Sequence, residues 1–290
     1  MANTRDIRNR IKSVKNTSQI TKAMQLVAAS KMKRAQDTAL EGRPYTALLA
    51  QMLFCIQSQL TEIQHPFLEQ RPIQRRGILI ITTDKGLCGG LNTNLFRLTF
   101  PAKDEARFVA IGRKGAQFLA RSRFDLAANF SISDKAHFTE VRPVIDFMID
   151  AFEKGEIDTI EVLYPRFINT LSQEPTLISL LPLKSLEAVL EEIAHAAGIN
   201  PPSQDDREVQ FEQEPVVLLD SLLRLYLKQL LYQKVLESKA SEHSARMVAM
   251  KTATDNAETL IDDLTLEYNK VRQAAITQEI LEISAASFAA

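Results

Sequence analysis

The sequence predicts an α/β domain carried between two long helices that pair in a coiled coil. Two observations predict this fold class. Glycine and proline, which interrupt regular structure, are missing before Gly42 and again from Val216 to the last residue. Between these stretches, short apolar runs alternate with helix-like segments, which is typical of a mostly parallel sheet covered on both faces. We assign three parts: residues 1–65 as an N-terminal helical arm, 72–208 as the α/β domain, and 209–290 as the long C-terminal helix.

The C-terminal stretch holds 75 residues without a helix breaker. As one helix it would be about 110 Å long, far beyond an ordinary globular helix. A pattern of this length indicates a coiled coil or a helical repeat, and no fixed repeat is present. Apolar residues recur at steps of mostly three and four, as the seam of a coiled coil requires. They are Leu219, Leu222, Leu223, Tyr226, Leu230, Leu260, Leu264, Tyr268, Val271 and Ala275.

The N-terminal stretch has the same spacing over a shorter length. A helix of its forty-odd residues would span about 60 Å and pair with only part of the C-terminal helix. Its six-residue step between Val14 and Ile20 predicts a local change of supercoil. The expected seam residues are Ile7, Ile11, Val14, Ile20, Met24 and Val27.

Charge favours the pairing of the two ends. The formal net charge is only -1, which argues against a polyelectrolyte binder. Residues 1–43 nevertheless carry a net charge of +7, and residues 252–290 carry −5. A basic helix attracts an acidic one at short range. No aromatic residue precedes Tyr45, so nothing in the basic helix predicts stacking on nucleic-acid bases.

The middle of the chain reads as alternating strands and helices. Short runs rich in β-branched and apolar residues predict buried strands, and amphipathic segments between them predict helices. The expected strands are residues 77–83, 107–111, 159–163 and 176–181, and the expected helices are 114–122 and 141–154.

A glycine-rich segment, TDKGLCGGLN at residues 83–92, follows the first expected strand. Such a turn can cradle phosphate, but the P-loop pattern and the dinucleotide fingerprint are both missing, and Lys85 precedes the glycines. A tight structural turn is therefore the favoured interpretation. Gly86, Gly89 and Gly90 are expected to supply positive φ angles.

The remaining reactive residues predict no catalytic, metal or cofactor site. Cys55 and Cys88 lie far apart and form no CxxC pair, which favours a reducing compartment without a disulfide. Cys88 lacks an evident partner base. No secretory signal and no membrane span are readable, so any membrane association is expected to be indirect. The four histidines are too scattered for metal-ligand spacing: His65, His137, His195 and His243.

Four segments resemble one family, the gamma subunits of the F-type ATP synthase. Residues 7–36 (IRNRIKSVKNTSQITKAMQLVAASKMKRAQ) resemble its N-terminal helix, and residues 83–92 its (S)DRGLCGGLN turn. Residues 236–257 and 266–283 resemble its C-terminal signature, whereas residues 184–214 match poorly. The chain departs from the family at Lys85, where arginine is usual, and in its last residues, EISAASFAA. It also lacks the paired cysteines of the photosynthetic branch, so no thiol switch is expected.

The resemblance implies an antiparallel coiled coil with a Rossmann-like domain at one side. It implies a central rotor shaft that couples transmembrane ion flow to ATP synthesis or hydrolysis, with no catalytic site and no cofactor of its own. The implied partners are the alpha and beta subunits of the hexameric head, the epsilon subunit and the membrane c-ring. The implied location is the cytoplasmic face of the cell membrane, as a peripheral protein.

The resemblance also implies contact residues on the shaft. Met24, Arg246 and Gln273 match the family's contacts with beta-subunit loops, and Thr277 lies one turn further on the same face. Because antiparallel pairing brings Met24 near this part of the C-terminal helix, we expect Met24, Arg246 and Gln273 to share one zone. Two alternatives remain from the residues alone: a coiled-coil scaffold or membrane-surface adaptor that uses the basic helix, and a small α/β enzyme that uses the glycine turn.

Overall fold

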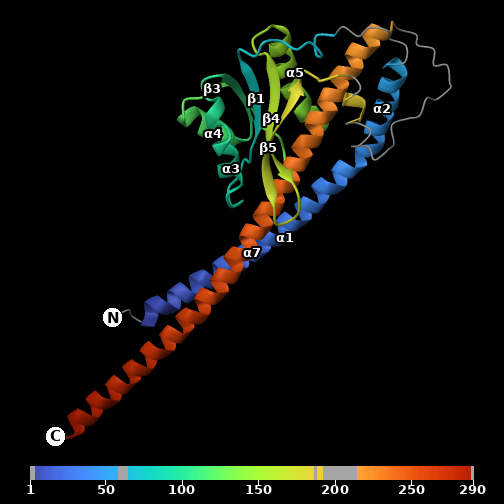
Figure 1. Cartoon of the computed structure of the whole chain (residues 1–290). Helices are drawn as coiled ribbons and strands as arrows, with labels where there is room; N and C mark the ends of the chain where they lie inside the picture. Colours follow the sequence, from blue (N-terminus) through green and yellow to red (C-terminus); the bar gives the residue numbers. More distant parts are fainter. Residues whose placement is uncertain (1–3, 58–64, 186–187, 192–213, 289–290) are drawn as a thin grey trace. The chain divides into compact units, whose positions relative to one another are not determined.

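The computed structural model describes residues 4–57, 65–185, 188–191 and 214–288 (Figure 1). The chain divides into two compact units. Residues 1–29 and 246–290 form one, which we call the helix-pair unit, and residues 30–245 form the other, which we call the sheet unit. The expected boundary between residues 208 and 209, and His195, lie outside the described residues.

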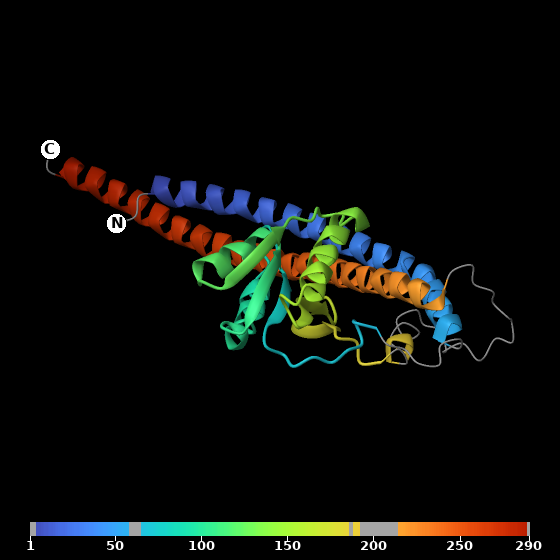
Figure 2. The same cartoon turned by 90° about the horizontal axis from the view of Figure 1, so that it is seen from above.

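The helix-pair unit consists of segments of two helices, α1 (Thr4–Glu41) and α7 (Pro215–Phe288). These segments lie side by side and antiparallel in both views (Figures 1 and 2). The hydroxyls of Thr21 and Thr254 are 2.7 Å apart, and Arg8 donates a hydrogen bond of 2.5 Å to the hydroxyl of Tyr268. The predicted antiparallel pairing of the chain ends is therefore confirmed.

The seam of α1 differs from the predicted one. Ile20 and Val27 are exposed, whereas Ser18, Thr21 and Ala28 are buried. Buried and half-buried positions follow an unbroken three-four spacing through Ile7, Ile11, Val14, Ser18, Thr21, Gln25 and Ala28. The predicted break after Val14 was wrong because small polar residues occupy two seam positions there, and an apolar pattern does not count them. On α7 the seam likewise runs through Ala257, Ile261 and Leu264 instead of Leu260.

The sheet unit is built on a five-stranded sheet in the order β3-β2-β1-β4-β5. β1 pairs in parallel with β2 and β4, β2 pairs in parallel with β3, and β4 pairs antiparallel with β5. The predicted mostly parallel sheet is confirmed, with one strand, β3, that the sequence did not predict. The bounds are β1 Arg76–Ile81, β2 Ala106–Ile111, β3 Asp125–Phe130, β4 Thr159–Phe167 and β5 Gln173–Leu181.

Helices cover both faces of the sheet, because alternate strand residues point to opposite faces. On β1, Ile78 and Ile80 pack in a core with α3 and α4, whereas Leu79 and Ile81 join a core with α2, α5 and α7. α7 contributes the predicted Leu219, Leu222, Leu223 and Tyr226 to the second core. The bounds are α2 Arg43–Gln57, α3 Leu91–Arg97, a 3₁₀ turn Phe100–Ala102, α4 Arg113–Arg121 and α5 Phe138–Glu153.

Candidate functional site

The residues expected to contact a partner all belong to the helix-pair unit. Met24 and Arg246 are half-buried, whereas Gln273 and Thr277 are exposed on α7. The Thr277 hydroxyl donates to the backbone carbonyl of Gln273 at 3.0 Å, and the side chain of Gln273 is exposed. These side chains have the chemistry of a contact surface, because they offer polar hydrogen-bond donors and one flexible thioether. They include no nucleophile paired with a general base.

The expectation that Met24, Arg246 and Gln273 share one zone is wrong. Because Thr21 lies opposite Thr254 in the antiparallel pair, Met24 lies at the level of about residue 251 of α7, five residues or about 7.5 Å along the axis from Arg246. Gln273 lies 27 residues beyond Arg246 on the same unbroken helix, which is about 40 Å along its axis. The candidate contacts therefore form two zones, one at Met24 and Arg246 and one at Gln273 and Thr277.

The glycine turn lies at the carboxyl end of β1 and leads into α3. The Thr83 hydroxyl donates to the Lys85 carbonyl at 2.7 Å, and Asn92 Nδ2 donates to Thr83 Oγ1 at 2.8 Å. Gly89 has φ +58°, as expected, but Gly90 has φ −84° and Gly86 also lies outside the left-handed region. The other left-handed residue of the turn is Leu87, with φ 63°. A turn closed by its own hydrogen bonds fits a structural role.

Cys88 is buried in this turn and behaves as a small apolar residue. It is 3% exposed, and its sulfur accepts from Asn92 Nδ2 at 3.6 Å. We expect Cys88→Ala to change the free energy of unfolding by about 1 kcal/mol or less. Gly89→Val should cost more, about 1–3 kcal/mol, because a β-branched residue resists positive φ. Urea unfolding measures the free energy of unfolding of both variants. A larger loss for Cys88→Ala than for Gly89→Val would contradict the structural role of the glycine.

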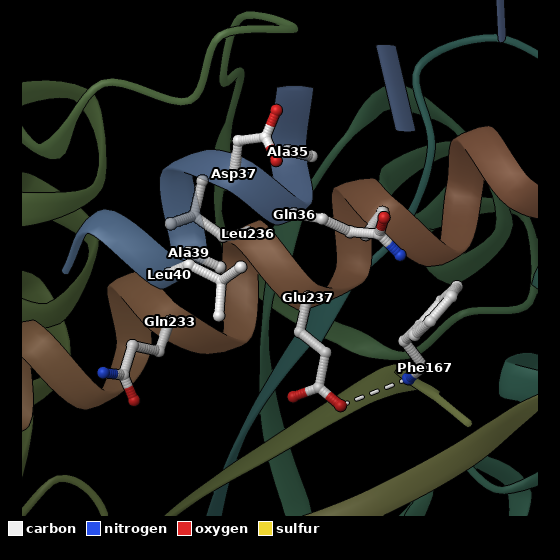
Figure 3. A pocket seen from close by; sticks show the side chains of 10 residues that line it. Ala35, Gln36, Asp37, Ala39, Leu40, Phe167, Gln233, Leu236 and Glu237 are labelled. Atoms are coloured by element: carbon white, nitrogen blue, oxygen red, sulfur yellow. Dashed lines mark hydrogen bonds between the residues drawn. The ribbon is translucent and has the colours of Figure 1, made fainter. Parts of the chain in front are cut away.

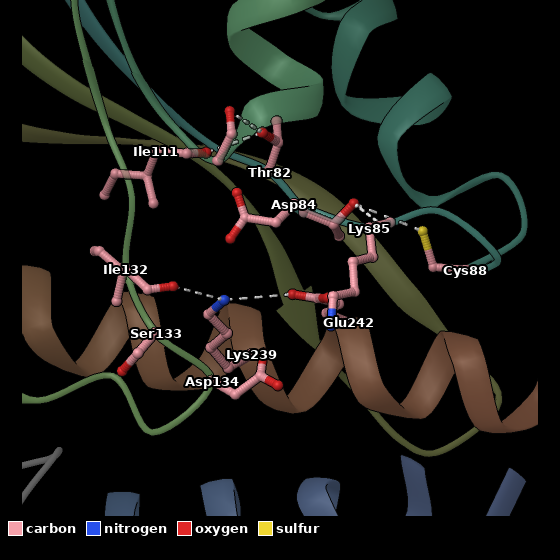
Figure 4. A network of polar contacts seen from close by, with 12 residues as sticks. Thr82, Asp84, Lys85, Cys88, Ile111, Ile132, Ser133, Asp134, Lys239 and Glu242 are labelled. Atoms are coloured by element: carbon pink, nitrogen blue, oxygen red, sulfur yellow. Dashed lines mark hydrogen bonds and ion pairs between the residues drawn. The ribbon is translucent and has the colours of Figure 1, made fainter. Parts of the chain in front are cut away.

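A run of polar residues on α7 is buried; it lies within residues 236–257, which carry the family resemblance, but the sequence did not predict its burial. Lys239 and Glu242 are each 5% exposed, His243 is 2% exposed, and the Lys239 ammonium lies 3.6 Å from the Glu242 carboxylate. Figure 4 shows this pair below the loops at the carboxyl edge of the sheet. Sequence patterns treat a polar run in a helix as a solvated face, so only the tertiary structure reveals it.

Asp134, in the loop after β3, pairs with the part of α1 that belongs to the sheet unit. Lys31 Nζ lies 2.6 Å from Asp134 Oδ2. This hydrogen bond lowers the pKa of Asp134 below its usual value; burial acts against the shift, and the charges of Lys31, Lys239 and His243 reinforce it. Because the folded-state pKa is depressed, the stabilisation is present above the unfolded-state value of about 4 and is lost as pH falls through the folded-state pKa.

We therefore expect Asp134→Asn to lower the free energy of unfolding at pH 7 by at most about 1 kcal/mol, since the pair is partly exposed and screened. The difference from the parent chain should shrink below pH of about 4. Thermal unfolding from pH 7 to pH 3 measures it, with Lys31→Met as the variant that removes the other partner. A difference of constant size across this range would contradict the assignment.

A cavity of about 510 Å³ lies among α1, α7 and the end of β4 (Figure 3). Its polar lining consists of the carboxylates of Asp37 and Glu237 and the amides of Gln36 and Gln233. Glu237 already accepts a hydrogen bond of 3.1 Å from the backbone N–H of Phe167. A lining with two carboxylates does not suit a phosphate ligand, and none of the residues predicted as contacts lines the cavity.

No group of histidine, cysteine, aspartate or glutamate side chains in the described part of the chain is arranged to hold a metal ion. Within the same ranges, no helix has both the length and the apolar character needed to cross a membrane. His65 is buried and makes a structural contact, with its Nε2 at 3.1 Å from Asp220 Oδ1.

Comparisons with known proteins agree on one family. A family model described as ATP synthase matches residues 3–289. The ATP synthase gamma chain of Opitutus terrae is 58% identical over 100% of this chain and 99% of its own length, and that of Methylacidiphilum infernorum is 45% identical over the same shares. A chain of the Euglena gracilis mitochondrial ATP synthase, in its OSCP/F1/c-ring structure, aligns with a TM-score of 0.70, 19% identity and coverage of 99% and 94%. A chain of the Tetrahymena thermophila mitochondrial ATP synthase, in its central stalk and c-ring structure, aligns with a TM-score of 0.56 and 24% identity. The alignment covers 81% of this chain and 99% of that one.

Proposed function

This chain belongs to the family of ATP synthase gamma chains and is the central stalk rotor of an F-type ATP synthase, and we propose that its helix pair couples transmembrane ion flow to the alpha and beta subunits at two levels. The observation that carries the proposal is the unbroken helix α7, whose last part outreaches α1. Residues beyond about Gln273 have no α1 segment left to pair with, because Arg8 already lies beside Tyr268.

The chain itself performs no ATP chemistry, because the catalytic sites of the complex lie on the beta subunits. Coupling through a rotor requires that the shaft stabilise some states of each catalytic subunit more than others. We assign this differential contact to Arg246 and Met24 at one level and to Gln273 and Thr277 at the other. A guanidinium and an amide make directional hydrogen bonds, whereas the Met24 thioether accommodates a partner that slides past.

The remaining partners are proposed on the same family membership. We propose that the sheet unit and the adjoining helix ends meet the epsilon subunit and the membrane c-ring, and that the protein works as a peripheral subunit at the cytoplasmic face of the cell membrane. The solved relatives from Euglena and Tetrahymena come from assemblies whose descriptions include a c-ring. In this arrangement residues 1–65 and 209–290 form the shaft, and residues 72–208 form the domain beside it.

Co-purification tests the proposal directly. An affinity-tagged chain expressed in its organism of origin should co-purify with the alpha, beta and epsilon subunits and the c-ring. The purified assembly should hydrolyse ATP, and the isolated chain should not. Recovery of the chain with lipid or unrelated proteins, without alpha and beta subunits, would contradict it. Hydrolysis by the isolated chain would contradict the absence of its own catalytic site.

A further inference from the structure

The buried polar stretch of α7, residues 237–244, is out of place on an ordinary coiled-coil helix. Lys239 and Glu242 are charged yet 5% exposed, and Ser241 and Ser244 are fully buried. Removing charges from water is costly, and replacing such a pair with well-packed apolar residues is often neutral or stabilising. Stability alone therefore does not account for a buried charged pair at this position of α7.

The side chains of this stretch bind loops from one edge of the sheet. Lys239 Nζ donates to the carbonyl of Ile132, after β3, at 3.5 Å. Glu237 accepts from the backbone N–H of Phe167 at 3.1 Å, and Ser244 Oγ donates to the carbonyl of Thr170 at 2.8 Å, both after or at the end of β4. Two connections at the carboxyl ends of the strands, after β3 and after β4, thus meet about two turns of helix.

The glycine turn after β1 approaches the same place. Figure 4 shows the side chain of Lys85 extending toward Glu242, with Lys239 between Glu242 and Ile132. In the sheet, β1 lies between β2 and β4, so the chain winds in opposite directions on its two sides. Open parallel sheets bind their ligands at this switch point, outside the carboxyl ends of the strands. Here a turn of α7 lies against the loops that would line such a site.

We infer that Lys239 and Glu242 are positioning residues that fix the rotational register of α7 on the sheet, so that torque passes between the sheet unit and the shaft helix. The inference rests on the rotor function and names the residues through which torque is transmitted. Apolar contacts below the pair, at Leu231 and Val235, are non-directional and tolerate a rotated helix. The buried charges do not: Lys239 and Glu242 lie three residues apart on α7 and move together, so rotation would carry both out of their buried position and take Lys239 away from the Ile132 carbonyl.

Two measurements on matched variants test this inference. In the variant Lys239→Met/Glu242→Leu, both charges are removed together, so no unpaired charge is left buried; Lys239→Arg keeps the charge and the donor. Register is measured on the isolated full chain by electron spin resonance distances between labels at the exposed positions Gln117 on α4 and Ser221 on α7, with Cys55→Ser and Cys88→Ala in the background. Transmission is measured in the assembled complex as ions pumped per ATP hydrolysed.

We expect the double variant to melt within a few degrees of the parent chain but to show a broadened or shifted label distance and a severalfold lower pumping ratio. Lys239→Arg, with Glu242 in place, should keep the parental label distance and the parental pumping ratio. A parental distance distribution, an unchanged pumping ratio, or loss of folding in the double variant would each overturn the inference. The label distance needs no partner subunit, so its failure is distinguishable from a failure of the chain to assemble into a rotor.

Discussion

Gly112→Ala should destabilise the sheet unit by about 2–6 kcal/mol, the largest loss expected for a single methyl group in this chain. Gly112 joins β2 to α4 with φ 95° and ψ 144°, a conformation that only glycine adopts readily. A Cβ added there would lie 2.3 Å from the backbone carbonyl oxygen of Thr82. Thr82 is held in place on both sides, so its carbonyl cannot move away. Its backbone N–H donates to the Ile111 carbonyl at 2.9 Å, and its hydroxyl accepts a hydrogen bond of 2.9 Å from the backbone N–H of Gly115.

Gly155→Ala provides the matched control for this prediction. Gly155 also has a positive φ, 72°, but an added Cβ would meet nothing within 4 Å. Its substitution should therefore cost only the backbone strain, about 1–2 kcal/mol. Urea unfolding followed by circular dichroism compares the two variants with the parent chain. Equal losses for Gly112→Ala and Gly155→Ala would show that close approach to Thr82 adds nothing.

The long-range organisation was predictable because it depends on residues that forbid regular structure. The absence of glycine and proline from the two ends predicted helices that the structure contains, and β-branched runs predicted β1, β2 and β4. β3 was missed because its residues, DLAANF, contain no β-branched residue and do not alternate; most are half-buried. Such a strand is held by its parallel neighbour β2 and not by its own preference.

Side-chain environment was less predictable than secondary structure, for a physical reason. Ser18 and Thr21 occupy seam positions because small hydroxyls can be buried when they bond to backbone or to each other, as Thr21 does with Ser18 O and Thr254. Lys239 and Glu242 are buried because loops far away in sequence surround them. Neither circumstance leaves a signal in an apolar pattern, which treats every polar residue as exposed.

Arg246→Ala and Gln273→Ala should each slow ATP turnover of the assembled complex about tenfold while leaving its subunit composition unchanged. A hydrogen bond to a charged group contributes about 1.5–3 kcal/mol, and losing one that strengthens in the rotational transition state slows turnover by about that factor or more. Native gels check assembly, and single-molecule rotation measures rate. Gln117→Ala, the same change at an exposed helix position in the sheet unit, should rotate at the parental rate.

The double variant Arg246→Ala/Gln273→Ala tests whether these residues act through two contact zones or through one. Arg246 and Gln273 are separated by 27 residues of continuous helix, about 40 Å, so they share no neighbours. Energetic effects of sites more than about 10 Å apart usually add, and two independent tenfold losses multiply to about a hundredfold. A double variant no slower than either single one would mean that the two residues act through one contact. Parental rotation rates in both single variants would instead require that Arg246 and Gln273 be withdrawn as partner contacts, leaving the unpaired end of α7 to act through shape alone.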